Sequence, residues 1–327
     1  MRALRVHGFE GWHQWSLDEV AAPEPGPGQV RIAVEAVAPS FVDLLYARGG
    51  YQLKPVLPGI PGSEFCGMVE RIGPGVADAR LVPGTRVAGF SFGGVWAEQL
   101  CVAASHVQPL AAGAVAAEAA ALAGPYGTAR YALVGRAGLR AGETVFVLGA
   151  AGAVGMAAVQ VAKALGARVI AGASGEAKGQ AACAAGADAA VDLSQPGWRE
   201  RLKAVAPGGT VDVVVDPLGG DYTEPAFRSL GWGGRHLMIG FAGGGIPALR
   251  GNLALLKGAS LVGVDARQFM EREPAAAAAN LQAVCALYAQ GRVRPLVQAQ
   301  YPFERWREAL AAVEDRRTIG RVALLWN

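Results

Sequence analysis

The sequence predicts an α/β protein with two domains, one rich in β-strands and one built on a doubly wound parallel sheet. Residues 1–120 contain short apolar or alternating segments separated by proline and glycine, a pattern typical of strands and turns. Residues 121–265 instead alternate continuous apolar runs with helical segments, as parallel sheets covered on both faces do. The length of 327 residues fits two domains of about 150 residues each.

In the first part of the chain, strands are expected at residues 30–37, 66–72 and 86–90. Ile32 and Val34 alternate with their neighbours, as in a strand with one buried face. Proline and glycine predict loops at residues 23–28 and 72–75. Many short strands with such turns indicate a barrel-like or sandwich domain.

The second part carries continuous apolar runs that we predict to be strands of the parallel sheet, at residues 144–148, 168–173, 211–215, 235–239 and 260–264. Helices are expected between them at residues 154–165 and 176–185.

Beyond residue 265, helical segments at 274–290 and 303–315 precede a last strand at 320–325. We expect the chain to return there to the first domain. The β-rich domain would then comprise residues 1–120 and 266–327, and the parallel-sheet domain residues 121–265.

Composition excludes several classes of protein. Hydrophobic residues make up 52% of the chain and charged residues 17%, which rules out a disordered protein. The net charge of +3, with no basic stripe, predicts no nucleic-acid partner. The N-terminus lacks the apolar core of a signal peptide, and the apolar stretch at 144–162 fits a strand, turn and helix better than a membrane span. We therefore expect a cytoplasmic protein.

The cysteines and histidines predict no metal site. The four cysteines lie far apart, without the close spacing of a zinc or redox motif. The four histidines are scattered singly and are expected to be solvated or satisfied structural residues. No Ser/His/Asp or Cys/His arrangement is readable.

The sharpest local signal is the sequence VFVLGAAGAVG at 145–155, in which an apolar strand enters a glycine turn and a helix leaves it. Gly152 would let the backbone approach a pyrophosphate, and Gly155 would let the helix pack closely on the strand. The helix start at Ala153 and Val154 offers free N–H groups to the phosphates. Ala150 replaces the first glycine of the usual dinucleotide fingerprint, so a glycine-rich packing turn is the alternative.

The end of the next strand indicates which dinucleotide binds. An acidic residue there would bind the ribose hydroxyls of NAD, but this chain has Ser174, with Lys178 one helical turn later. A hydroxyl and a cation suit a 2′-phosphate and favour NADPH, although the neighbouring Glu176 weakens this interpretation. The alternative is a solvated helix start, with Ser174 as its N-cap.

The ends of the later strands should line the same crevice. The sequences DPLGG at 216–220 and GFAGGG at 240–245 stand there, so Gly240 is a candidate cofactor contact. Phe241 would cover the nicotinamide, and its alternative is ordinary core packing.

Ordered landmarks along nearly the whole chain resemble the zinc-independent medium-chain dehydrogenases/reductases of the quinone oxidoreductase, zeta-crystallin-like type. They are SFVD at 40–43, RGGY at 48–51, PGSE at 61–64, AGLRAGE at 137–143, GAAGAVG at 149–155, LLKG at 255–258 and RTIGRV at 317–322. The resemblance implies a GroES-like catalytic domain built from both chain ends, a Rossmann domain between them, and a homodimer joined near residues 260–264. It also implies that Thr128 contacts the nicotinamide phosphate.

Two features of the resemblance concern chemistry. The family often has asparagine where this chain has Ser40, in a motif that touches nicotinamide or substrate. Serine is shorter, so this polar contact is expected to be lost or carried by water. The positions that hold catalytic zinc in zinc-containing relatives read Ser40, Ser63 and Gly124, which supply no thiolate or imidazole. We therefore expect no metal.

Without a metal, the expected chemistry is hydride transfer from NADPH to an electrophilic conjugated acceptor. Tyr51 is the first candidate for a hydrogen-bond or proton donor, Ser40 is a weaker one, and Asp43 would orient a neighbour. A tyrosine on a cleft rim with a solvated hydroxyl is the alternative for Tyr51.

The leading function is an NADPH-dependent quinone reductase on a small-molecule quinone. An enone or enoyl reductase on the same scaffold and a non-catalytic nucleotide-binding protein are the alternatives.

Overall fold

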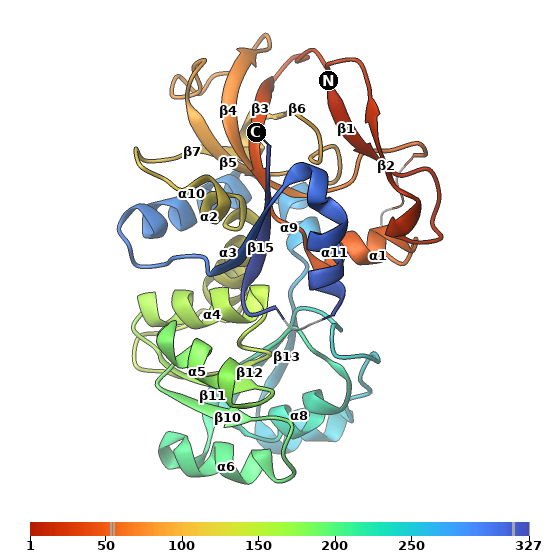
Figure 1. The fold of residues 1–327 in the computed structure, drawn as a ribbon. Helices are drawn as coiled ribbons and strands as arrows, with labels where there is room; N and C mark the ends of the chain where they lie inside the picture. The colour runs from red at the N-terminus through yellow and green to blue at the C-terminus, as the bar shows by residue number, and fades with distance from the viewer. Residues whose placement is uncertain (53, 55, 316–317, 327) are drawn as a thin grey trace. The chain divides into compact units, whose positions relative to one another are not determined.

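The computed structural model describes residues 1–52, 54, 56–315 and 318–326, which fold into two compact units (Figure 1). The β-rich unit contains Met1–Gly124, Glu273–Gln290 and Pro295–Asn327. The parallel-sheet unit contains Pro125–Arg272 and Gly291–Arg294.

The β-rich unit is organised around strand β3 (Gln29–Val37), which pairs with three other strands of a 7-stranded sheet. The sheet has the order β14-β15-β3-β4-β5-β7, with β6 on β3. Its other strands are β4 (Glu64–Ile72), β5 (Arg86–Phe90), β6 (Gln99–Ala103), β7 (Val107–Pro109), β14 (Val297–Pro302) and β15 (Arg321–Leu325), and β1 (Arg2–Arg5) pairs separately with β2 (Ser16–Glu19). Because β15 pairs antiparallel with β3, segments from both ends of the chain build one domain.

The helices of this unit are short, apart from α10. They are α1 (Phe41–Ala47), α2 (Ala116–Ala120), α10 (Pro274–Ala289) and α11 (Trp306–Glu314), with 3₁₀ turns at Trp12–Gln14, Ala104–His106 and Phe303–Arg305. The core gathers tryptophans from distant segments: the Trp15 ring stacks on Trp306 and meets Trp96 edge to face.

The parallel-sheet unit contains a 6-stranded sheet in the order β10-β9-β8-β11-β12-β13, and every pair of neighbours is parallel. The strands are β8 (Thr144–Leu148), β9 (Arg168–Ala173), β10 (Ala189–Asp192), β11 (Val211–Asp216), β12 (Leu230–Met238) and β13 (Ser260–Gly263). The chain runs outward from β8 to β10 and then resumes at β11 on the other side of β8. In such sheets, ligands bind beyond the carboxyl ends of the strands at this switch point.

Helices of this unit contact the sheet along its strands, and α4 packs on β8 and β9. The helices are α3 (Ala123–Arg130, which continues as a π-helix over Tyr131–Arg136), α4 (Ala153–Ala164), α5 (Glu176–Ala184), α6 (Trp198–Val205), α7 (Thr223–Phe227), α8 (Gly251–Lys257) and α9 (Ala266–Arg272), with 3₁₀ turns at Pro207–Gly209 and Gly220–Tyr222. An apolar core on one face of the sheet joins Phe146, Ile170 and Val214 to Leu202 and Phe227 of the helices.

The predicted fold class is confirmed, because a parallel doubly wound sheet and a β-rich domain are both present. Several elements differ from the sequence prediction, and two of the differences concern where an element begins. Strand β12 begins at Leu230, five residues before the predicted start at 235, because Leu230 already pairs with Val211 of β11 ahead of an irregular glycine-rich stretch. The helix predicted at 303–315 begins with a 3₁₀ turn and becomes α-helical at Trp306. Among the described residues, no helix has the length and apolar character needed to cross a membrane.

Candidate functional site

The glycine turn between β8 and α4 has the local geometry of a phosphate-binding turn. Gly149 adopts φ of 61°, a left-handed conformation that favours glycine. Gly152 is the N-cap of α4, so Ala153, Val154 and Gly155 form its first turn. The first N–H groups of a helix have no partner inside the helix and point out of its N-terminus. They provide partial positive charge where an anion would sit.

Gly152 and Gly155 are glycines for different reasons. A Cβ at Gly155 would lie 2.1 Å from the carbonyl oxygen of Gly149, so the protein itself excludes a side chain there. Gly152 has an ordinary φ of −81°, and the nearest atom to its Cβ position is the Gly149 oxygen at 3.3 Å. Protein atoms therefore crowd a side chain at position 152 much less than at position 155. A Cβ at 152 would make a tight contact with this backbone oxygen, but not the severe clash that a Cβ at 155 would make.

The turn after β9 holds Ser174, which is exposed, and Lys178, which is half-buried on the first turn of α5. The N-cap of α5 is Gly175, so the alternative role of Ser174 as an N-cap is wrong. The Asp192 carboxylate at the end of β10 accepts a hydrogen bond from the Gly175 N–H at 2.9 Å. This bond is the largest of several effects that lower the pKa of Asp192. The negative charge of Asp192 therefore lies beside the turn that holds Ser174.

The turn after β11 contacts two other segments of the predicted site. The Leu218 side chain lies against Gly149, since a Cβ there would be 3.0 Å from Leu218 Cδ2. A Cβ at Gly219 would lie 2.8 Å from Cδ1 of Phe241. The turn after β11 therefore joins the glycine turn to the loop that follows β12.

Backbone hydrogen bonds fix the loop after β12 to the turn after β11. The N–H of Gly243 donates to the Leu218 carbonyl at 2.7 Å, and the N–H of Gly220 donates to the Gly245 carbonyl at 2.9 Å. Gly240 is half-buried at the start of this loop. The Phe241 side chain is 42% exposed, so its alternative assignment as an ordinary core residue is wrong.

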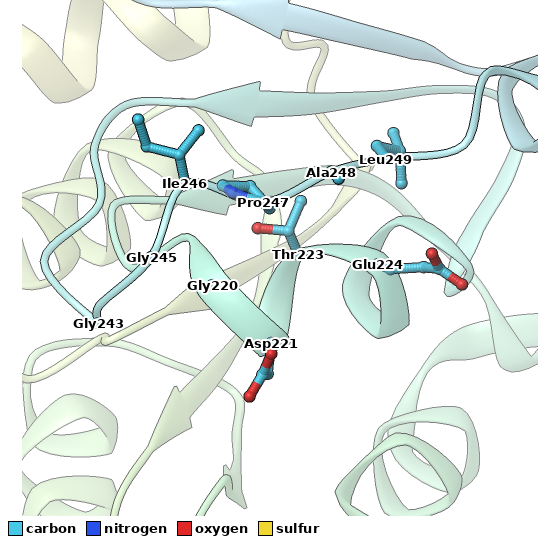
Figure 2. Close-up of a pocket in the computed structure, with 10 residues that line it drawn as sticks. All are labelled: Gly220, Asp221, Thr223, Glu224, Gly243, Gly245, Ile246, Pro247, Ala248 and Leu249. Atoms are coloured by element: carbon cyan, nitrogen blue, oxygen red, sulfur yellow. The ribbon is translucent and has the colours of Figure 1, made fainter.

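A cavity of about 390 Å³ lies between this loop and the start of α7 (Figure 2). Figure 2 shows the carboxylates of Asp221 and Glu224 on the helical segment opposite the loop that carries Ile246. The lining residues are Gly220, Asp221, Thr223, Glu224, Gly243, Gly245, Ile246, Pro247, Ala248 and Leu249. None of them is among the individual contacts predicted from the sequence, although three of the glycines belong to the glycine-rich segments noted there.

The predicted catalytic residues lie in the β-rich unit, and Ser40 and Asp43 form a capping box at the start of α1. The Ser40 N–H and hydroxyl both donate to Asp43 Oδ2, at 2.7 and 2.8 Å. Asp43 is 2% exposed, and burial raises its pKa against the opposing effects of Ser40 and Arg321. Because its hydroxyl hydrogen is bonded to Asp43, Ser40 can donate to a substrate only by leaving Asp43.

Tyr51 lies beyond the end of α1 and is half-buried.

The same unit contains a buried ion pair, in which Arg321 donates to Glu64 Oε1 at 2.9 Å. A Cβ at Gly124 would lie 2.6 Å from the Glu64 Cδ, so this glycine leaves room for the carboxylate. In the described part of the chain, no group of three or more His, Cys, Asp or Glu residues is arranged to hold a metal ion.

The remaining predicted contact, Thr128, is half-buried on α3. The predicted residues at the ends of β8, β9 and β12 thus share one edge of the sheet, whereas Thr128 is on a helix that precedes the sheet. Near this edge the buried carboxylate of Asp216 is hydrogen-bonded to two other buried residues, Thr223 and His236. Sequence reasoning noted Asp216 only as part of the segment at 216–220 and gave Thr223 and His236 no role in the site. The only sequence signal was the position of Asp216 at the end of an apolar strand.

A parallel sheet with a glycine turn at its switch point, in one chain with a β-rich domain built from both chain ends, is the architecture typical of two-domain dinucleotide-dependent oxidoreductases. Residues 26–112 match the alcohol dehydrogenase GroES-like domain, and residues 153–282 match the zinc-binding dehydrogenase domain. The chain belongs to the quinone oxidoreductase family of the medium-chain dehydrogenases/reductases.

Individual relatives resemble the chain over almost its whole length. Quinone oxidoreductase-like protein 2 of Mus musculus is 36% identical over 94% of this chain and 88% of its own length. The quinone oxidoreductase of Rattus norvegicus is 33% identical over 99% of this chain and 98% of its own. The structure of the quinone oxidoreductase of Thermus thermophilus, solved also with NADPH, superposes with a TM-score of 0.84, at 32% identity over 99% of this chain and 100% of that one.

Proposed function

We propose that the protein is an NADPH-dependent quinone oxidoreductase that works without a metal. The single observation that carries the proposal is the turn at residues 149–155, where Gly152 is the N-cap of α4 and Gly155 packs directly on the backbone of Gly149. The helix N-terminus at this turn fits the pyrophosphate of a dinucleotide. The relatives named quinone oxidoreductase, one of them solved with NADPH, support the choice of cofactor and acceptor.

The residues that would hold the dinucleotide follow the edge of the sheet. The N–H groups of residues 152–155 would bind the pyrophosphate. Ser174 and Lys178 would bind the 2′-phosphate, and Lys178 has to outweigh the charge of Asp192 on the same turn. The nicotinamide half would be contacted by Gly240, Phe241 and Thr128.

The cofactor supplies the hydride, and the chain has to orient the acceptor, exclude water and stabilise the charge that develops on the acceptor oxygen. Tyr51 is the proposed donor to that oxygen. The Ser40 hydroxyl is bonded to Asp43, so the proposed role of this pair is to shape the start of α1 beside the substrate. No residue has to act as a general base in this scheme, because a quinone is already electrophilic and loses no proton when it accepts the hydride.

An enone or enoyl reductase is the second candidate, because Tyr51 would then supply the proton that a reduced C=C bond requires. NADPH consumption by the purified protein should be measured in parallel with an ortho-quinone, a para-quinone and a simple enone, with NADH as control. Turnover on quinones with NADPH, and much slower turnover with NADH, is expected. Turnover on the enone alone would favour the second candidate, and NADPH binding without turnover would contradict both.

We also propose a homodimer joined through the edge strand β13. Large apolar side chains are exposed on this strand and on the two elements that precede it in the chain, β12 and α8: Leu261 is 48% exposed, Trp232 87% and Leu255 80%. Exposed apolar patches of this kind mark association surfaces. Sedimentation of the wild type as a dimer and of Trp232→Lys as a monomer is expected, and a monomeric wild type would contradict the proposal.

A further inference from the structure

Asp216, the last residue of β11, has a fully buried carboxylate that accepts hydrogen bonds on both oxygens. Oδ1 accepts from the backbone N–H groups of Leu218 at 3.0 Å and Gly219 at 2.8 Å. Oδ2 bonds the Thr223 hydroxyl at 2.7 Å and the His236 ring at 2.9 Å. One oxygen therefore holds the turn after β11, and the other is held by residues of the core.

His236 reaches Asp216 from the neighbouring strand. The register of β11 and β12 pairs Val214 with His236, so His236 projects on the same face of the sheet as Asp216. The imidazole is fully buried and stacks on Phe227 with ring centroids 5.9 Å apart. Nε2 faces the carboxylate, and Nδ1 has no hydrogen-bond partner among the described residues. The register of the two strands therefore places the ring against Asp216.

The carboxylate is held in its ionised form. Burial is the largest effect on the pKa of Asp216 and raises it. The hydrogen bond and electrostatic attraction of the His236 ring, together with the bonds from Gly219 and Thr223, outweigh burial and bring this pKa below its ordinary value. A carboxylate that only accepts requires a hydrogen on Nε2 of His236. Removing that donor would leave the buried carboxylate with one hydrogen bond fewer, which raises the free energy of the folded state.

The turn that Asp216 holds contains two glycines in left-handed conformations, Gly219 with φ of 67° and Gly220 with φ of 59°. Glycine gives a chain more freedom than any other residue, so such a turn needs bonds from outside to keep one conformation. Asp216 supplies them through the N–H groups of Leu218 and Gly219. The same turn contacts Gly149 and Phe241 and is bonded to the loop after β12.

We infer that Asp216 and His236 are positioning residues of the dinucleotide site, which hold the turn at 217–220 and, through it, the glycine turn and the loop of Gly240 and Phe241. The inference rests on the proposed dinucleotide function. Neither residue touches the cofactor in this scheme. The chain of contacts is His236 to Asp216, Asp216 to the turn, and the turn to two segments of the site.

Two variants of His236 separate this role from general core stability. His236→Phe keeps an aromatic ring of similar size beside Phe227 but removes the donor to Asp216. His236→Gln keeps an N–H donor near the position of Nε2. Phe227→Leu is the matched control, because it perturbs the same core cluster without removing a hydrogen bond to Asp216. If His236 only stabilised the core, nucleotide affinity would fall in step with the urea midpoint in all three variants.

The measurements are the dissociation constants of NADPH and NADH, the urea midpoint of each variant, and hydrogen exchange at the amides of Leu218 and Gly219. His236→Phe is expected to weaken the binding of both nucleotides about tenfold, as loss of a hydrogen bond to a charged group does, and to speed exchange at both amides. His236→Gln should bind both nucleotides close to the wild-type affinity. Phe227→Leu should lower the urea midpoint and leave nucleotide affinity unchanged.

Equal weakening of binding in Phe227→Leu and His236→Phe, or unchanged binding in His236→Phe, would overturn the inference. The proposed quinone reductase activity fails separately, by the absence of turnover in a wild type that still binds nucleotide. In that case the comparison of dissociation constants still decides the role of His236. A wild type that binds neither nucleotide would overturn both proposals.

Discussion

Gly155 touches Gly149 across the turn between β8 and α4, and a Cβ on Gly155 would lie 2.1 Å from the Gly149 oxygen and 2.8 Å from the Cα of Ala150. The contact is between backbone atoms, so no side-chain rotation can relieve it. The start of α4 is thereby fixed against the end of β8. Its N–H groups accordingly face a defined point beyond the sheet edge.

This contact predicts different effects of alanine at two positions of one turn. Gly155→Ala should lower the free energy of unfolding by about 1–3 kcal/mol, as overpacking of a well-packed site does. Gly152→Ala should lower the free energy of unfolding less than Gly155→Ala does, because its Cβ would lie 3.3 Å from the Gly149 oxygen. It should also weaken NADPH binding, because this Cβ would stand where the pyrophosphate is proposed to approach the backbone. Urea unfolding and nucleotide titration of both variants measure these effects. Unchanged NADPH affinity in Gly152→Ala would place the pyrophosphate elsewhere.

The choice between NADPH and NADH is predicted to depend on Lys178. Lys178→Ala should weaken NADPH binding about tenfold, by the loss of a charge-assisted hydrogen bond to the 2′-phosphate, and leave NADH binding unchanged. Lys163→Ala is the matched control, because Lys163 is a lysine of the same unit whose ammonium is paired with Asp188. Nucleotide titration at fixed ionic strength gives the two constants. Equal losses for NADPH and NADH would assign Lys178 to the shape of α5 instead.

The proposed role of Tyr51 predicts a change in kcat rather than in cofactor binding. Tyr51→Phe should lower kcat about a hundredfold, the size typical of a lost general acid, while KM for NADPH stays near its wild-type value. Tyr301→Phe, on β14 of the same unit, is the control for removal of a tyrosine hydroxyl. Steady-state kinetics with the best acceptor measure both constants. A kcat equal to that of Tyr301→Phe would remove Tyr51 from the mechanism.

Local patterns were sufficient for most of the parallel-sheet unit. Strand β8 and helix α4 were predicted within one residue at each end, because a continuous apolar run and a helical repeat meet at glycines. Strand β10 was missed because its four residues, AAVD, carry too short an apolar pattern to stand out. The short helix α1 was missed although its capping residues were noted for chemistry.

The residues that position the site were beyond local patterns. Asp216 and His236 are twenty residues apart and meet only through the register of β11 and β12. Glu64 and Arg321 are 257 residues apart and meet because β15 returns to the sheet of β4. Such pairs depend on strand order and register, and no short stretch of the sequence indicates either of them.

The pair of Glu64 and Arg321 leads to a prediction on pH. The two side chains are 4% and 6% exposed, and Oε2 of Glu64 has no hydrogen-bond partner among the described residues. Burial is the largest effect on the pKa of Glu64, and it raises this pKa above the ordinary 4.5 despite the opposing charge of Arg321. Asp43 raises it further. Folded protein therefore binds a proton here at pH values where the unfolded chain has lost it.

The sign of the effect follows from proton linkage: because the folded state binds more protons, the free energy of unfolding falls as the pH rises from 4.5 through the folded pKa of Glu64. Glu64→Gln removes this titration, so its unfolding free energy should depend less on pH over that interval. At neutral pH the variant should also be less stable by about 3 kcal/mol, since the buried Arg321 loses its counter-charge. Urea unfolding from acidic to neutral pH measures both effects, with Glu304→Gln as the exposed control. A pH dependence in Glu64→Gln as steep as in the wild type would mean that another group, such as Asp43, holds the proton.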